Sequence, residues 1–426
     1  LGPDHAPLYP PRAELFRPVP ANGHPGPPNG GRPRSTGPPG APAAAVLRSP
    51  AMPPAARHVA PGRAAARTSR FLVPVALVAL LGLVAGCAAR RPVVLPELRD
   101  RTERIPVVLV PGVTGTVLVD RDTGRTVWGD GKRLLVPRDG GRSTALPLDP
   151  ASPPQAIAED EIRTIRLFGG LVRFEVYGPV IAWMEANGYR TGDLDRPDAE
   201  SPFYVFPYDG RRSAVDAAAA LADRLEAIRR ARGEDVLRVH LLCQSNAAQI
   251  ARYLVRYGGA PLPRAESGDA RPLATVRVEK LFLVGTGNAG ALRVLREMNV
   301  GRRYVPWIGR RLLPEVFFTY PSLYEALPAR RDDLFVDATG TPLDVDLFDP
   351  ESWRRYGWSI LAPDALARAL APRHRDTFVD RAAIDDHLAR SLHRARRLHD
   401  VILVDPPGYR PPAIYSIQSR SSDTPG

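Results

Sequence analysis

The residues best suited to covalent chemistry lie in the pentapeptide "CQSNA", residues 243–247. A serine hydroxyl becomes a nucleophile when a base takes its proton and when amide N–H groups stabilise the oxyanion that forms. Enzymes of this kind place the serine on a sharp strand-to-helix turn, with small residues two positions before and after it. Cys243, Ser245 and Ala247 follow that spacing, although the usual motif has glycines at the outer positions. An ordinary turn can have the same composition, so the helices and strands on either side are needed to distinguish a catalytic serine from a simple turn.

Those neighbouring elements alternate between strand and helix. The apolar run Val236–Leu242 predicts a buried strand, and Ala247–Tyr257 has apolar residues at helical spacing. A strand at Val107–Val110, a helix at Ala214–Arg232 and a strand ending at Val284 continue the alternation. This pattern predicts an α/β fold: a largely parallel sheet with helices on both faces.

The strand Val107–Val110 ends at Pro111-Gly112, where backbone N–H groups can face an anion. A Pro-Gly pair after a strand is also a common simple turn. Parallel sheets carry their chemistry at the carboxyl ends of their strands. We therefore expect Val113, Ser245 and the loop after Val284 to meet at one edge. Cys243, two residues before Ser245, is expected to point into the sheet and pack there.

Six segments, taken in order, resemble the lecithin:cholesterol acyltransferase family and its bacterial relatives, which are α/β-hydrolases acting on lipid acyl esters. The segments are "VVLVPGVTGTVL", "GYRTGDL", "FPYDGRRS", "HLLCQSNAAQIARYLVRYG", "LVGTGNAG" and "FFTYPSLYEALP". The resemblance covers residues 106–426 and implies an α/β-hydrolase domain. It also implies a cap over the acyl site, at about residues 290–400. An ordered set of motifs is more specific than any single one.

The resemblance assigns roles residue by residue. It implies that Ser245 is the acyl-accepting nucleophile and that the backbone N–H groups of Val113 and Asn246 form the oxyanion hole. Structural or substrate-supporting residues are implied at Pro111, Gly112, Tyr208, Asp209 and Arg211. Gly210 stands where the family has a tryptophan.

A serine hydrolase of this fold also needs an Asp and then a His after the nucleophile. Four histidines follow Ser245, and none has a loop-after-strand setting: His374, His387, His393 and His399. The last three lie in a predicted amphipathic helix and are expected to be solvated, and His240 is expected to be a core residue. Asp405 and Asp423 are weak candidates for the acid. We expect the Asp and His beyond Gly426, so that the chain is C-terminally incomplete or the protein has lost its triad.

The amino-terminal part has a different composition. Residues 1–67 are rich in Pro, Gly, Ala and Arg and are expected to be disordered, and Met52 is a possible true start. Residues 68–87 combine a basic stretch, an apolar run and "LVAGC", which resembles a bacterial lipobox with Cys87 as the lipidated residue. A transmembrane anchor is the alternative, but the apolar run is short. Residues 88–105 are a linker.

The composition argues against several classes of function. The net charge of +12 comes almost entirely from arginines spread along an Ala- and Pro-rich chain, so we do not expect nucleic-acid binding. Two cysteines exclude a disulfide framework and a cysteine metal site. The acidic residues Asp337, Asp344 and Asp346 do not have the spacing of a Ca²⁺ loop. No cofactor and no metal are expected.

Two functional hypotheses follow from these observations. The first is an exported, lipid-anchored serine O-acyltransferase, lipase or phospholipase, whose partners are a lipid acyl donor and an alcohol or water acceptor. It would sit at a bacterial membrane, on the periplasmic or outer face, through lipidated Cys87. The second is a catalytically incomplete lipid-binding lipoprotein with the same fold. The acceptor and the oligomeric state are left open.

Overall fold

The computed structural model describes residues 92–418, apart from 132, 134–136, 138, 168–169, 171, 305–308, 330–333 and 375–376. Met52, the lipobox with Cys87, and Asp423 lie outside the described residues, so the expectations about them remain predictions. Within the described part of the chain, no helix is both long and apolar enough to cross a bilayer.

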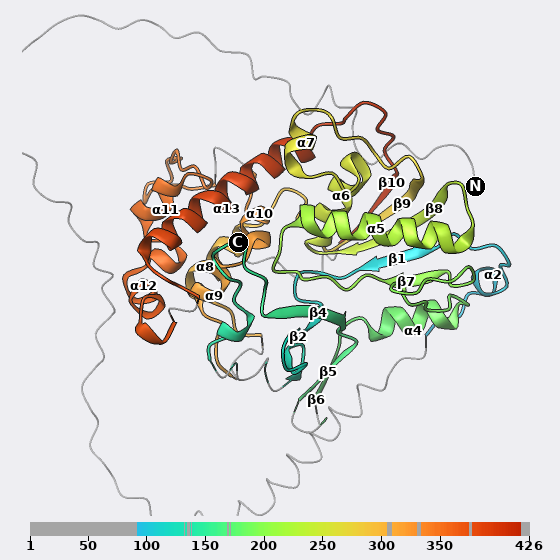
Figure 1. Ribbon diagram of the computed structural model, residues 1–426, viewed down its shortest axis with the longest axis horizontal. Coiled ribbons are helices and arrows are strands. Elements are labelled where there is room, and N and C mark those ends of the chain that lie inside the picture. Colours follow the sequence, from blue (N-terminus) through green and yellow to red (C-terminus); the bar gives the residue numbers. More distant parts are fainter. Residues whose placement is uncertain are drawn as a thin grey trace, which may run out of the picture. The chain divides into compact units, whose positions relative to one another are not determined.

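A five-stranded parallel sheet forms the centre of the fold (Figure 1). Its strands, in the order β10-β9-β8-β1-β7, are β1 (Val107–Val110), β7 (Phe203–Val205), β8 (Leu237–Gln244), β9 (Val276–Val284) and β10 (Ala413–Ile417). Every pair of neighbours is parallel. Strands of a parallel sheet that are buried on both faces read as continuous apolar runs, as β1 ("VVLV") and β7 ("FYV") do, whereas the edge strand β10 is exposed. The predicted parallel sheet is confirmed.

Helices cover both faces of this sheet. The helices α5 (Ala214–Arg232) and α6 (Ala247–Tyr257) share one apolar core with the inward residues of β8, including buried Cys243. The helix α4 (Gly178–Ala186) packs on the opposite face, over β1 and β7. The helix α5 begins where Ser213 accepts a hydrogen bond from the N–H of Val215, and it ends before Gly233.

An antiparallel insertion separates β1 from β7 in the chain. Its elements are β2 (Thr116–Asp120), β3 (Thr126–Trp128), η2 (Arg142–Thr144), β4 (Ala156–Glu161) and the hairpin of β5 (Thr164–Leu167) and β6 (Val172–Glu175). The insertion folds back onto its own start, because Ile162 N donates to Gly115 O at 2.8 Å. Tyr177 N then donates to Ile162 O at 3.2 Å. Both ends of the insertion therefore meet at the turn that follows β1.

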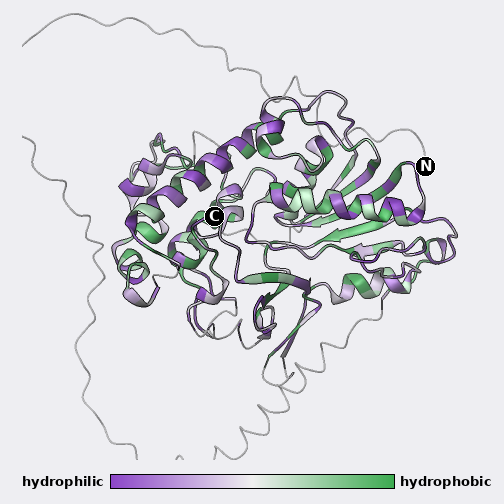
Figure 2. Ribbon diagram, in the orientation of Figure 1, coloured by the Kyte–Doolittle hydropathy of each residue, from purple (hydrophilic) through white to green (hydrophobic). Residues whose placement is uncertain are grey.

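A second apolar core lies among the helices of the carboxyl-terminal half. Its helices are α8 (Leu292–Val300), α9 (Pro314–Phe318), α10 (Pro321–Glu325), α11 (Pro350–Tyr356), η4 (Ser359–Leu361), α12 (Pro363–Ala369) and α13 (Arg381–Ile402). Trp353 is fully buried there, Trp358 is half-buried and Tyr356 is exposed. Along α13, hydrophilic and hydrophobic residues alternate at helical spacing (Figure 2). The range 290–400 that the resemblance assigns to a cap contains most of these helices. Short elements α2 (Pro96–Arg99), α7 (Leu262–Glu266) and η5 (Pro372–His374) complete the described chain.

The two cores are joined at the end of α10. The carboxylate of Glu325 accepts hydrogen bonds from Ser213 Oγ at 2.5 Å and from Ala214 N at 2.7 Å, at the start of α5. Gln249 of α6 donates to the carbonyl oxygen of Glu325 at 2.7 Å. Burial raises the pKa of Glu325 to about 7, although Arg394 and the hydrogen bonds from Ser213 and Ala214 to the carboxylate oppose the rise.

The histidines of α13 differ in their surroundings. His387 is 6% exposed and its Nε2 lies 3.0 Å from Phe318 O. Burial lowers its pKa to about 4. His399 is half-buried beside Phe348, whereas His393 is exposed. The expectation that all three are solvated is therefore wrong for His387, because that side of α13 packs against α10.

Candidate active site

Ser245 lies on the sharp turn between β8 and α6. Its φ angle is 56°, which is a left-handed conformation that a residue with a side chain rarely adopts. The N–H of Ser245 donates to Val284 O at 3.0 Å, so the exit of β9 holds the turn. Cys243 and Ala247, the small residues on either side, are fully buried. A strained serine between two buried small residues at a strand-to-helix turn is the backbone geometry that a nucleophile elbow requires.

The turn after β1 lies directly against this elbow. It spans Gly112 to Gly115 and is closed by a hydrogen bond from Gly115 N to Gly112 O at 2.9 Å. A Cβ atom on Gly112 would lie 3.1 Å from the Cβ of Ser245 and would overlap the side-chain oxygen of Gln244. Pro111 and Gly112 are buried, whereas Val113 is half-exposed. The closing bond uses the amide of Gly115 and not that of Val113, which fits Val113 as an oxyanion donor.

The second expected donor is at the start of α6. Asn246 is the N-cap residue of this helix, and its side chain makes no capping hydrogen bond. The first amides of an α-helix have no partner within the helix, and they lie at the positive end of its dipole. The eleven residues of α6 are long enough to develop that dipole. Asn246 and the turn after β1 therefore flank Ser245 with donors for an anion.

The loop after β7 supports the turn from the other side. Arg211 is buried, and its guanidinium binds Asp209 at 2.7 Å, Thr144 O at 2.9 Å and Ala156 O at 2.5 Å. A Cβ on Gly210 would overlap the carbonyl group of Val113. The loop and the turn are therefore in close contact, and this contact leaves no room for a side chain at position 210.

Tyr208, in the same loop, is almost fully buried. Its ring stacks on Phe206, with ring centroids 5.9 Å apart. Its hydroxyl has no hydrogen-bond partner among the described residues. Burial raises its pKa, so the hydroxyl stays protonated. The Tyr208 ring thus forms part of the core beneath the site.

Sequence reasoning did not find Tyr177, which touches both the turn and the elbow. Its hydroxyl accepts a hydrogen bond from Gly112 N at 2.8 Å and donates one to Gln244 Oε1 at 2.9 Å. Tyr177 precedes α4 and is 65 residues from Gly112. No periodicity or motif in the sequence indicates this contact.

The candidate bases and acids in the described chain are held elsewhere. His240 lies five residues before Ser245 on β8, about 16 Å away along the strand, with its ring against Phe282. Asp405 pairs with Arg256 at 3.1 Å, and Arg256 is about 14 Å along α6 from its first residue. His387 and His399 of α13 make the contacts described above, and His393 is exposed. Within the described residues, no histidine is hydrogen-bonded to Ser245.

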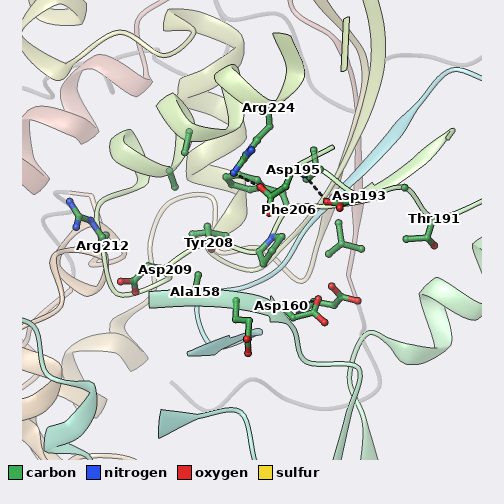
Figure 3. Close-up of a pocket in the computed structure, with 18 of the residues that line it drawn as sticks. Ala158, Asp160, Thr191, Asp193, Asp195, Phe206, Tyr208, Asp209, Arg212 and Arg224 are labelled. Carbon is green, nitrogen blue, oxygen red and sulfur yellow. Dashed lines mark hydrogen bonds and ion pairs between the residues drawn. The ribbon is translucent and has the colours of Figure 1, made fainter. Parts of the chain in front are cut away.

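The hollow of about 550 Å³ shown in Figure 3 lies over the carboxyl end of β7 rather than over Ser245. Asp160, Asp193 and Asp195 line it, and Asp195 pairs with Arg224 at 2.5 Å. In the described part of the chain, no group of three His, Cys, Asp or Glu residues has the geometry to hold a metal ion. The hollow is therefore an acidic surface cleft beside the candidate site.

A smaller and more apolar pocket adjoins the turn after β1. Its volume is about 40 Å³. It is lined by residues that include Val113, Gly210, Trp128, Tyr304 and Phe317. The rings of Trp128 and Tyr304 meet edge to face, with centroids 4.7 Å apart. The pocket runs from the candidate oxyanion residue toward the second core.

A parallel sheet with helices on both faces, together with a strained serine at a strand-to-helix turn, defines an α/β-hydrolase-like fold. No family model and no curated protein sequence matches the chain. Among solved structures, one match is a chain of "The crystal structure of Tle4-Tli4 complex". It has a TM-score of 0.46 and 15% identity, and covers 71% of this chain and 72% of that chain.

Proposed function

We propose that the protein is a serine-dependent O-acyltransferase or lipase that acts on lipid acyl esters, as the resemblance to the lecithin:cholesterol acyltransferase family implies. The observation that carries this proposal is the position of Ser245. Its backbone is strained, it directly follows the carboxyl end of β8, and two candidate N–H donors flank it. Strain of this kind costs about 1 to 3 kcal/mol and tends to be retained at functional sites.

The proposed reaction is acyl transfer in two steps. A general base, which the resemblance implies is a His and which no described residue supplies at Ser245, takes the proton of Ser245 Oγ while the oxygen attacks the ester carbonyl. The amides of Val113 and Asn246 stabilise the oxyanion. The carbon–oxygen bond to the alcohol then breaks, and the alcohol leaves with the proton. Water or a second alcohol attacks the acyl-enzyme and releases a fatty acid or a new ester.

Two features support a lipid as the acyl donor. The first is the small apolar pocket beside Val113, whose volume of about 40 Å³ has room only for the first carbons of an acyl chain next to the oxyanion donors. The second is the lipobox-like segment that ends at Cys87, which would hold the enzyme at a membrane surface. We therefore place the protein outside the cytoplasm, anchored through lipidated Cys87.

The test uses the full chain and vesicles of phosphatidylcholine with a labelled acyl chain, with and without a long-chain alcohol. We expect release of labelled fatty acid, or labelled ester when the alcohol is present. Ser245→Ala should lower this rate at least about 1000-fold, whereas Ser359→Ala should leave it unchanged. Vesicle binding without any turnover by the folded wild-type chain would contradict the proposal and favour the lipid-binding hypothesis.

A further inference from the structure

The side chain of Tyr177 connects the two halves of the candidate oxyanion hole. Its hydroxyl accepts a hydrogen bond from Gly112 N at 2.8 Å, on the turn after β1. The same hydroxyl donates to Gln244 Oε1 at 2.9 Å, and Gln244 directly precedes Ser245. One oxygen atom therefore spans the turn and the elbow.

The ring of Tyr177 also fixes the other end of the turn. A Cβ on Gly115 would lie 2.6 Å from a ring carbon of Tyr177, so ring and turn are already in contact. The backbone supports this arrangement, because Ile162 binds Gly115 through its N–H and Tyr177 through its carbonyl oxygen. The turn is therefore held by a hydroxyl at Gly112 and by a ring at Gly115.

These contacts matter because an oxyanion hole works only when its donors are fixed before the charge develops. Val113 lies between the two glycines that Tyr177 contacts. The hydroxyl engages the amide of Gly112 and the closing bond uses the amide of Gly115, which leaves those of Val113 and Thr114. Of these two, the resemblance assigns the amide of Val113 to the oxyanion. Burial raises the pKa of Tyr177, which keeps its hydroxyl protonated as a donor to Gln244 at neutral and mildly alkaline pH.

We infer that Tyr177 is the positioning residue of the oxyanion hole: it holds the Gly112–Gly115 turn in register with Ser245 and so aims the Val113 amide. The catalytic part of this inference rests on the proposed function. The structural part, that the hydroxyl holds the turn, does not.

The test compares Tyr177→Phe with Tyr204→Phe as a matched control. Tyr204 is also fully buried, and its hydroxyl donates to Asp198 O at 3.1 Å, a carbonyl outside the elbow and the turn. Each variant thus loses one tyrosine hydroxyl: Tyr177→Phe loses the two hydrogen bonds that link the turn to the elbow, and Tyr204→Phe loses one hydrogen bond outside both. Urea unfolding first establishes that both variants fold.

The first measurement is amide hydrogen exchange at residues 112–115. In Tyr177→Phe this exchange should become at least about tenfold faster, while in Tyr204→Phe it should match the wild type. Unchanged exchange in a folded Tyr177→Phe would overturn the inference, whether or not the protein is an enzyme. If Tyr177→Phe does not fold, Gln244→Met removes the other contact of the hydroxyl and should also speed exchange in the turn.

The second measurement is ester turnover with p-nitrophenyl butyrate. Tyr177→Phe should lower kcat about 10- to 100-fold with KM within about twofold, because misaligned donors weaken binding of the transition state more than of the ester. Tyr204→Phe should keep the wild-type kcat. Equal kcat values in the two variants would overturn the positioning role. A wild type with no turnover contradicts the proposed function instead. Hydrogen exchange then still tests whether the Tyr177 hydroxyl holds the turn.

Discussion

Ser245 and Ser359 have almost the same strained backbone but very different surroundings. Their φ angles are 56° and 57°, and they are the two non-glycine residues with positive φ among the described residues. Ser245 is half-exposed, between the amides of the turn after β1 and the start of α6. Ser359 is 1% exposed and begins η4 inside the second core. Its N–H donates to Asn299 Oδ1 at 2.6 Å, and its hydroxyl has no partner in the described part of the chain.

The difference shows that a strained serine is not a site by itself. Strain holds a side chain in an unusual direction, but chemistry also needs access for a substrate and donors for the charge that develops. Ser245 has both, whereas Ser359 has neither. The loops around Ser245 should therefore control activity, and the packing around Ser359 should control only stability.

The largest expected effect is on the loop that touches Ser245. Gly112→Ala places a methyl group against Gln244 and the Cβ of Ser245, so the turn must move away from the elbow. Ester turnover should fall about 100- to 1000-fold, as when an oxyanion donor is lost. Gly124→Ala, in the turn between β2 and β3, is the control: nothing lies within 4 Å of a Cβ there, and the positive φ of Gly124 should affect stability but not turnover. Near-normal turnover in Gly112→Ala would show that turnover does not depend on the position of this turn.

A smaller effect is expected at Glu325, which joins the region of Ser245 to the second core. The pKa of Glu325 is raised to about 7 from the ordinary 4.5. Ionisation is therefore less favourable in the folded protein, and the free energy of unfolding should fall as the pH rises through 4.5 to 7. The pKa difference corresponds to at most about 3 kcal/mol.

Urea unfolding of the wild type and Glu325→Gln between pH 4.5 and 8 measures this effect. The glutamine variant lacks the titrating group and should lose less stability over that interval. If the two pH profiles run parallel, the Glu325 carboxyl does not titrate in this window, and the contact between the two cores at Glu325 is not pH-sensitive.

The smallest effect is expected at Ser359. Ser359→Gly relieves the left-handed strain and removes a buried hydroxyl, against a cost of about 0.5 to 1 kcal/mol for the greater freedom of glycine in the unfolded chain. We expect it to raise the free energy of unfolding by about 1 kcal/mol, with turnover unchanged. Loss of turnover in a folded Ser359→Gly would show that Ser359 affects activity as well as stability.

The regular elements of the sheet region could be predicted because their residues meet local rules. The strand Val107–Val110 and the helix Ala214–Arg232 have the predicted bounds. The predicted strand Val236–Leu242 begins one residue later and ends two residues later. Apolar runs and a serine N-cap are enough to define such elements. The antiparallel pairing within the insertion between β1 and β7 was not predicted, because its strands are short and polar on one side.

The site could be predicted only in part. The position of Ser245 follows from the order of strand, small residues and helix, which is local information. The contact of Tyr177 with Gly112 joins residues far apart in the chain, and nothing in the local pattern around Tyr177 encodes it. The burial of His387 was missed for the same reason, since it depends on how α13 packs against α10.

The most direct test of Ser245 as the nucleophile is labelling of the full chain with a fluorophosphonate, followed by mass spectrometry of its peptides. A fluorophosphonate reacts with an activated serine and leaves a stable adduct, so the modified residue is read directly. If Ser245 is the nucleophile, an adduct should form on Ser245 and none on Ser359, and labelling should be lost in Ser245→Ala. A folded protein that gains no adduct, or one whose labelling survives Ser245→Ala, would show that Ser245 is not the nucleophile.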